Sequence, residues 1–234
     1  MSQKKSALNP WIQEFFIVLI MVAVIFILRT SIFSPYVIPT GSMLPTIKID
    51  DRVIANKLAY GLMIPFVDSQ ILSWSAPQRG EIVLFQSPTD EHTFVKRVAG
   101  IAGDKITFKE GVLHINGQPA SEVVQTDRTV LEDMGDTAID KTLYLESGLG
   151  PKPHLMLRMT VGGTTFFESR EFVVPPGHVF CLGDNRDGSN DSRFWGFVEV
   201  KKIYGKAGRV LFSTQRSESW RPHFRADRFF KLLE

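Results

Sequence analysis

The chain has 234 residues, 44% of them hydrophobic and 22% charged, and its 27 basic and 25 acidic side chains leave a net charge of +2. This composition allows a substantial hydrophobic core and excludes disordered and collagen-like chains, and without a dominating basic block nothing favours nucleic acid as a partner. The single cysteine, Cys181, excludes an internal disulfide framework and a thiolate metal cluster.

The first predicted element is an apolar segment near the N-terminus. Residues 15–28 read FFIVLIMVAVIFIL, and the apolar pattern continues less purely over residues 11–33. Because a helix rises about 1.5 Å per residue, only the longer range reaches across a hydrocarbon core of about 30 Å. Lys4 and Lys5 precede the segment, which favours a cytoplasmic N-terminus by the positive-inside rule. We therefore expect residues 1–33 to form a cytoplasmic N-terminus and a single transmembrane anchor.

A cleaved secretory signal peptide is the alternative interpretation of this segment, since two lysines before an apolar core have the right form. A cleavage site requires a pair of small residues two positions apart. The stretch after Leu28 reads RTSIFSP and contains no such pair. The uncleaved anchor is therefore favoured.

Beyond the anchor, short β-branched and aromatic runs bounded by turn residues replace helical periodicity. The sequence predicts a mostly β fold with an antiparallel core. Glu110-Gly111 and Asn116-Gly117 are typical of tight hairpin turns. Residues 118–163 are polar and weakly patterned, which indicates an elaboration on the core. We assign residues 34–105 and 170–234 to the main β core, and residues 106–169 to an inserted smaller β region.

The first segment with active-site residue types spans residues 38–46, IPTGSMLPT. Pro39 and Pro45 restrict the backbone, while Gly41 allows unusual dihedral angles beside Ser42. This pattern suits an exposed and rigidly held hydroxyl. An ordinary Pro/Gly linker that leaves a membrane is the alternative.

The second segment spans residues 94–104, FVKRVAGIAGD. Strand alternation places Phe94, Lys96 and Val98 on one face. If that face is buried, desolvation can lower the pKa of Lys96 from roughly 10.4 by up to ~3–5 units, which makes a general base near neutral pH. A hydroxyl nucleophile needs such a base. The alternative is a strand lysine whose ammonium reaches into water.

The third segment spans residues 183–196, GDNRDGSNDSRFWG. A calcium loop is excluded, because its first and twelfth positions would be Gly183 and Phe194 instead of Asp and Glu. A hydrogen-bonded scaffold fits better than a solvated polar loop. In it, the two arginines pair with nearby acids and a serine orients another side chain: Arg186 and Arg193 with Asp184, Asp187 or Asp191, and Ser189 or Ser192 as the serine.

Two other kinds of site find no support in the motifs. The five histidines show no metal spacing such as H-E-x-x-H, so no metal site is expected. Ser42 lacks the G-x-S-x-G elbow, which makes a Ser/His/Asp hydrolase a weak candidate.

Together and in this order, the three segments resemble the bacterial type I signal peptidases, also called leader peptidases. Asp51-Arg52 and residues 79–85 match the intervening family boxes, so the resemblance runs from the anchor to about Leu211. It implies a signal-peptidase-like β core and a membrane-bound serine endopeptidase of the serine/lysine type. Such an enzyme removes signal peptides from exported preproteins after an Ala-x-Ala site and needs no cofactor.

The resemblance also implies a role for each matching residue. Ser42 is the expected nucleophile and Lys96 the general base, oriented by Ser189. The expected oxyanion donors are the Ser42 backbone N–H and the Thr40 hydroxyl, where many family members carry serine. Asp191 and Arg193 are expected to form a supporting ion pair. Shallow apolar pockets for the small substrate side chains are expected at Tyr36, Ile38, Met43, Val53, Leu84, Phe94 and Val95.

The implied partners are secreted preproteins and membrane lipid, near the protein translocation channel, with no nucleic acid. The implied location is the inner or plasma membrane, with the catalytic domain on the periplasmic or extracellular face. Two alternatives stay open: a specialised processing peptidase of the same fold, and a non-catalytic membrane-tethered β module. A self-cleaving repressor is disfavoured by the anchor and by the lack of a DNA-binding domain. Intact Ser42, Lys96 and Ser189 disfavour the non-catalytic module.

Overall fold

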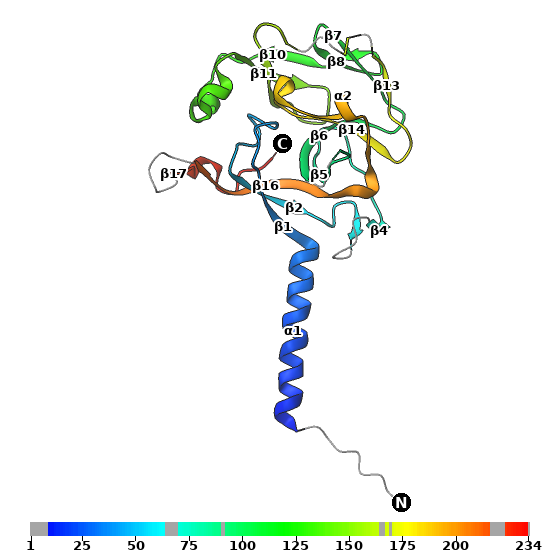
Figure 1. Cartoon of the computed structure of the whole chain (residues 1–234), viewed down its shortest axis with the longest axis vertical. Coiled ribbons are helices and arrows are strands. Elements are labelled where there is room, and N and C mark those ends of the chain that lie inside the picture. Colours follow the sequence, from blue (N-terminus) through cyan, green and yellow to red (C-terminus); the bar gives the residue numbers. More distant parts are fainter. Residues whose placement is uncertain are drawn as a thin grey trace, which may run out of the picture.

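A computed structural model of the chain describes residues 9–63, 70–89, 92–163, 167–168, 170–215 and 223–233. It consists of one long helix that stands apart from a β body (Figure 1). The helix, α1 (Pro10–Ile32), begins where the Asn9 side chain accepts a hydrogen bond from the Trp11 N–H, with proline at the first helical position. It ends at Phe33, whose extended backbone starts β1 (Phe33–Val37).

No helix in the described ranges is both long and apolar enough to cross a membrane. The transmembrane anchor over residues 1–33 stays a prediction. Lys4 and Lys5, on which its expected orientation rests, lie outside the described residues.

The main sheet has eight strands in the order β1-β2-β16-β5-β6-β14-β15, with β17 paired to β16. Every pairing in it is antiparallel, which confirms the mostly β antiparallel fold. The late strand β16 joins the hairpin-like pair β1-β2 to the pair β5-β6. The bounds are β2 (Asp51–Asn56), β5 (Ile82–Gln86), β6 (Thr93–Ile101), β14 (His178–Leu182), β15 (Val198–Glu199), β16 (Ile203–Gln215) and β17 (His223–Phe224).

Two smaller sheets lie on the side of the body away from α1 (Figure 1). One contains β7 (Lys105–Lys109), β8 (Val112–Ile115), β9 (Gln118–Pro119) and β13 (Phe172–Val173). The other contains β10 (Ser121–Val124), β11 (Lys141–Ser147) and β12 (His154–Met159). A separate hairpin pairs β3 (Gly61–Met63) with β4 (Gln70–Ser73). The short helices are η1 (Thr129–Ala138), η2 (Arg186–Gly188), α2 (Ser192–Trp195), η3 (Val200–Lys202) and η4 (Ala226–Arg228).

The two expected hairpin turns flank β8. Glu110, Gly111, Asn116 and Gly117 all have positive φ, which two-residue turns of this kind require. The three-stranded sheet β10-β11-β12, in contrast, falls in the weakly patterned residues 118–163. Its central strand β11 buries every third residue instead of the every second residue that strand alternation predicts.

The main sheet is buried on both faces at its centre. Ile82 and Leu84 of β5 pack in one apolar cluster, while Val83 and Phe85 pack in another. This division follows from the two-residue alternation of a strand. The first cluster also contains Met43 and so supports the loop between β1 and β2.

The C-terminal tail is docked on this same loop. Arg228 is fully buried and pairs with the fully buried Asp51 at the start of β2. Its guanidinium also donates to the Thr46 carbonyl at 2.9 Å. The tail thus fixes the end of the loop that carries Ser42.

We predict that Arg228→Ala destabilises the protein by about 3 kcal/mol, because it leaves the Asp51 carboxylate buried without its partner. Chemical denaturation of the full chain in detergent measures the loss. The control is Lys202→Ala, which removes an exposed lysine and should change the unfolding free energy by less than about 0.5 kcal/mol. Equal denaturation midpoints for the two variants would contradict the prediction.

Candidate active site

Ser42 lies in a tight loop between β1 and β2. Ile38 closes the base of this loop, since its N–H donates to the Asp51 carbonyl at 2.9 Å and its carbonyl accepts from the Asp50 N–H at 2.8 Å. Next to the half-buried Ser42, Met43 and Leu44 are almost fully buried and anchor the loop. The packing of Met43 and Leu44 in the core therefore fixes the backbone that carries the Ser42 hydroxyl.

Lys96 reaches this hydroxyl from β6. Its Nζ lies 2.6 Å from the Ser42 Oγ, within hydrogen-bond reach. Only 3% of the lysine is exposed. Burial lowers its pKa from 10.5 to about 8, although the negative charge of Asp191 opposes the shift. A neutral amine beside a hydroxyl is the arrangement that general-base activation of a nucleophile needs.

Asn185, which was not predicted as a site residue, binds the backbone of the Ser42 loop. Its backbone N–H donates to the Ser42 carbonyl at 3.1 Å, and its side-chain Nδ2 donates to the Gly41 carbonyl at 2.9 Å. Its Oδ1 accepts from Lys141 Nζ at 2.9 Å. The polar segment of residues 183–196 thus holds the Ser42 loop directly. The density of turn-forming polar residues in this segment indicated an ordered structure. It could not identify the Ser42 loop as the partner, because that loop lies more than 140 positions away in the sequence.

Gly183 allows two parts of the site to approach each other. A Cβ at this position would lie 2.2 Å from the Ser189 Oγ and 2.4 Å from the Ser42 carbonyl oxygen. Real Cβ atoms do not come this close to backbone oxygen. The segment can therefore pass behind Ser42 only with glycine at position 183.

The segment also carries the residues expected to support Lys96. Asp191 is fully buried and accepts from the Arg193 guanidinium at 2.8 and 2.9 Å and from the Gly183 N–H at 3.0 Å. Ser189 is buried, and its Oγ has no hydrogen-bond partner among the described residues. The structure therefore brings Ser189 to the site without a bond to Lys96.

Two further buried ion pairs stiffen this scaffold. Arg97, the neighbour of Lys96, pairs with both oxygens of Asp184 at 2.8 Å. Arg186 pairs with Glu146 of β11. Asp184 and Arg186 thus have different partners from those expected within the segment, because strands distant in sequence pack against it.

Ser42 and Lys96 both line a cavity of about 770 Å³. Among the residues expected at the site, those that line it are Tyr36, Ile38, Thr40, Ser42, Met43, Phe94, Val95 and Lys96. Thr40 is exposed. Val53 and Leu84 do not line the cavity, because both are fully buried in the apolar cluster beneath Met43.

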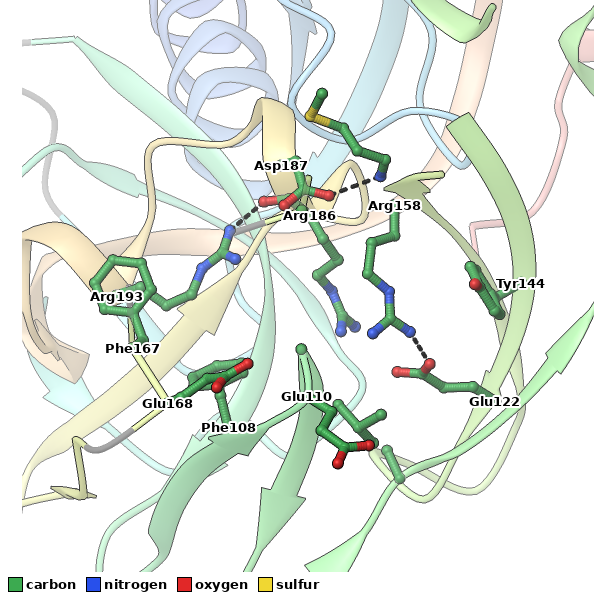
Figure 2. A pocket seen from close by; sticks show the side chains of 15 residues that line it. Phe108, Glu110, Glu122, Tyr144, Arg158, Phe167, Glu168, Arg186, Asp187 and Arg193 are labelled. Atoms are coloured by element: carbon green, nitrogen blue, oxygen red, sulfur yellow. Dashed lines mark hydrogen bonds and ion pairs between the residues drawn. The ribbon is translucent and has the colours of Figure 1, made fainter. Parts of the chain in front are cut away.

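A second cavity, of about 670 Å³, lies on the other side of the polar segment. Arg186, Asp187 and Arg193 are among the residues that line it (Figure 2). There the Asp187 carboxylate accepts from the Met159 N–H at 2.7 Å. The same short segment therefore contributes lining residues to this cavity and to the one that holds Ser42.

In the described part of the chain, no three His, Cys, Asp or Glu side chains are arranged to hold a metal ion.

A family model described as signal peptidase, peptidase S26, matches residues 9–212. The chain belongs to this family. Signal peptidase I of Pseudomonas aeruginosa is 36% identical over 222 residues, which cover 90% of this chain and 74% of the relative. Signal peptidase I of Rickettsia bellii is 33% identical, over 92% of this chain and 76% of the relative. Membership in the signal peptidase family is therefore confirmed, and with it the peptidase class.

We predict that Gly183→Ala lowers kcat of peptide cleavage by about 100-fold or more, because the added methyl group displaces Ser42 or Ser189 from its position. The matched control is Gly208→Ala, since a Cβ there meets no atom within 4 Å. Cleavage rates of a synthetic preprotein peptide, with circular dichroism as the check on folding, test the pair. Similar rates for both variants would refute the close-approach argument.

Proposed function

We propose that this chain is a membrane-bound signal peptidase that uses Ser42 as nucleophile and Lys96 as general base. It removes N-terminal signal peptides from exported preproteins after a site of the Ala-x-Ala type. The observation that carries this proposal is the 2.6 Å distance between the Lys96 Nζ and the Ser42 Oγ inside a cavity. Family membership supports signal peptide removal as the activity.

In the first step, the neutral Lys96 amine accepts the Ser42 proton while Oγ attacks the scissile carbonyl carbon. The resulting oxyanion receives hydrogen bonds from the Ser42 backbone N–H and the Thr40 hydroxyl. As the intermediate collapses, the Lys96 ammonium returns its proton to the departing amine, and an ester on Ser42 remains. Water, deprotonated by the same lysine, then hydrolyses the ester and frees the signal peptide.

The surroundings of Lys96 favour this cycle. With a pKa of about 8, roughly one tenth of the amine is neutral at pH 7. Asp191 lies close enough for its charge to stabilise the ammonium that forms in each half of the reaction. Its pairing with Arg193 moderates this attraction, so the amine is not held permanently protonated. Ser189, with its buried and unpartnered Oγ, is available to orient the amine.

Apolar walls fit the small residues expected before the cut. Ile38, Met43, Phe94 and Val95 line the cavity beside Ser42. Hydrocarbon walls close to the nucleophile favour short aliphatic side chains such as alanine and exclude water from Lys96. Val53 and Leu84 act only as the support beneath this lining.

We further infer that α1 anchors the enzyme in the inner or plasma membrane, with a cytoplasmic N-terminus and the β body on the outer face. Trp11, Phe15 and Ile25 are 80, 65 and 62% exposed, and no element of the body covers them. Lipid is the partner that such an apolar surface fits. Because β1 follows α1 directly, Ser42 stays close to the membrane, where preproteins leave the translocation channel.

A specialised processing peptidase of the same fold would share the chemistry and differ in its substrates. A non-catalytic module would keep the cavity but cleave nothing. Mass measurement of the products from a synthetic preprotein with an Ala-x-Ala site separates the three functions. We expect one cut after the second alanine.

We predict that Ser42→Ala and Lys96→Ala each reduce this cleavage below detection, because each removes one half of the proton transfer. The matched controls are Ser121→Ala and Lys105→Ala, which alter exposed side chains of the same types and should keep full activity. Activity in either active-site variant, with folding intact, would remove the proposed mechanism.

We predict that kcat/KM rises with pH and levels off above about pH 8. The active form of Lys96 is the neutral amine, and its pKa is lowered from 10.5 to about 8, so activity is lost as the pH falls below that value. The expected slope at low pH is about tenfold per pH unit. Initial rates on one peptide substrate across the pH range measure the profile, and Lys96→Arg, which stays protonated, should be inactive throughout. A flat profile would show that another group is the base.

A further inference from the structure

Lys141 is a cation at the catalytic cavity that the proposed mechanism does not use. It is a half-buried residue at the start of β11 and lines the same cavity as Ser42. Its Nζ donates to the Asn185 Oδ1 at 2.9 Å, and Asn185 in turn holds the carbonyls of Gly41 and Ser42. Only one side chain thus separates the ammonium of Lys141 from the nucleophile loop.

The cavity lining divides into an apolar part and a polar part. The apolar part comes from the end of β1 and the start of β6, with Tyr36, Ile38, Phe94 and Val95. The polar part includes Lys141 and the segment that follows β14, with Asn185, Gly188 and Asn190, while His92 and Thr93 add polar groups at the start of β6. Both parts meet at Ser42, so a peptide across the nucleophile contacts both.

The direction of the substrate follows from the proposed function, on which this inference rests. The apolar part receives the small residues before the cut and belongs to β1, which is continuous with α1. The polar part includes β11, which lies on the side of the body away from α1 (Figure 1). A preprotein whose signal peptide starts in the membrane therefore passes Ser42 and reaches Lys141 with the residues that follow the cut.

Lys141 supplies a positive charge to the polar part of the cavity, which receives the residues that follow the cut. The described lining residues include no Asp or Glu, so inside the cavity the ammonium is not neutralised. The negative charge that acts on it belongs to Asp187. Figure 2 shows the Asp187 carboxylate on the second cavity, engaged by the Met159 N–H. Burial lowers the pKa of Lys141 and Asp187 opposes this shift, so Asp187 helps to keep the side chain charged without lining the substrate path.

We propose that Lys141 is a specificity-determining residue that selects preproteins with an acidic side chain, and rejects those with a basic one, among the first residues after the scissile bond. An aspartate or glutamate there gains attraction to the ammonium, whereas a lysine or arginine meets a like charge beside a partly apolar wall. The hydrogen bond between Lys141 and Asn185 keeps the positive charge in a fixed position. The selection therefore depends on which substrate position after the scissile bond carries the acidic side chain.

The test compares peptides that share one Ala-x-Ala site and carry Asp, Asn or Lys at each of the first three positions after it. The wild-type chain, Lys141→Gln and Lys141→Glu are assayed side by side for kcat/KM. Lys141→Gln keeps a hydrogen-bond donor for Asn185 and removes only the charge. Thermal unfolding of each variant checks that the fold is retained.

At one or more of these positions, we expect the wild-type chain to prefer Asp over Lys by roughly tenfold, with Asn between them, because two weak charge effects of opposite sign add. Lys141→Gln should level the three peptides and Lys141→Glu should invert their order. Added salt should shrink the wild-type preference. An unchanged order in all three proteins overturns the proposal for Lys141 but leaves the peptidase function intact. Failure of the wild-type chain to cut any peptide overturns the proposed function instead.

Discussion

The site depends on one contact, the approach of a buried amine to a hydroxyl across two parts of the main sheet. The Lys96 Nζ lies 2.6 Å from the Ser42 Oγ, on a strand whose centre is packed on both faces. Desolvation lowers the pKa of the amine, and the same burial restricts its position. A lysine with its ammonium in water would have neither property. Both the lowered pKa and the fixed position of Lys96 therefore depend on the packing of β6.

The segment between β14 and β15 connects the packed core to the Ser42 loop and to the strand that carries Lys96. Asn185 binds the backbone of the Ser42 loop, while Asp191 and Arg193 form a pair beneath Lys96. Arg97 and Asp184 join the segment to the strand that carries the lysine. Ser42 and Lys96 are thus both held by a single polar scaffold, in which Asp184 and Asp191 are each paired with an arginine.

The sequence was informative where chemistry is local. The prolines and glycine around Ser42, the alternation around Lys96 and the Asn116-Gly117 turn each express a constraint within a few residues. Asn185, Lys141 and Glu146 were not predicted as part of the site, because their roles come from contacts between distant elements. The resemblance placed Val53 and Leu84 at the pockets, whereas both lie in the buried layer beneath the cavity lining.

The position of β16 has a consequence for how the enzyme is made. In the main sheet, β16 joins the strands that flank the serine, β1 and β2, to those of the lysine, β5 and β6, and the Arg228–Asp51 pair attaches the end of the chain to the serine loop. In a nascent chain that has not yet emerged beyond Ile203, β16 is missing. The strands that flank Ser42 and the strand that carries Lys96 are then not joined in one sheet. The sheet that joins the Ser42 strands to the Lys96 strand can therefore be completed only after most of the chain has been synthesised.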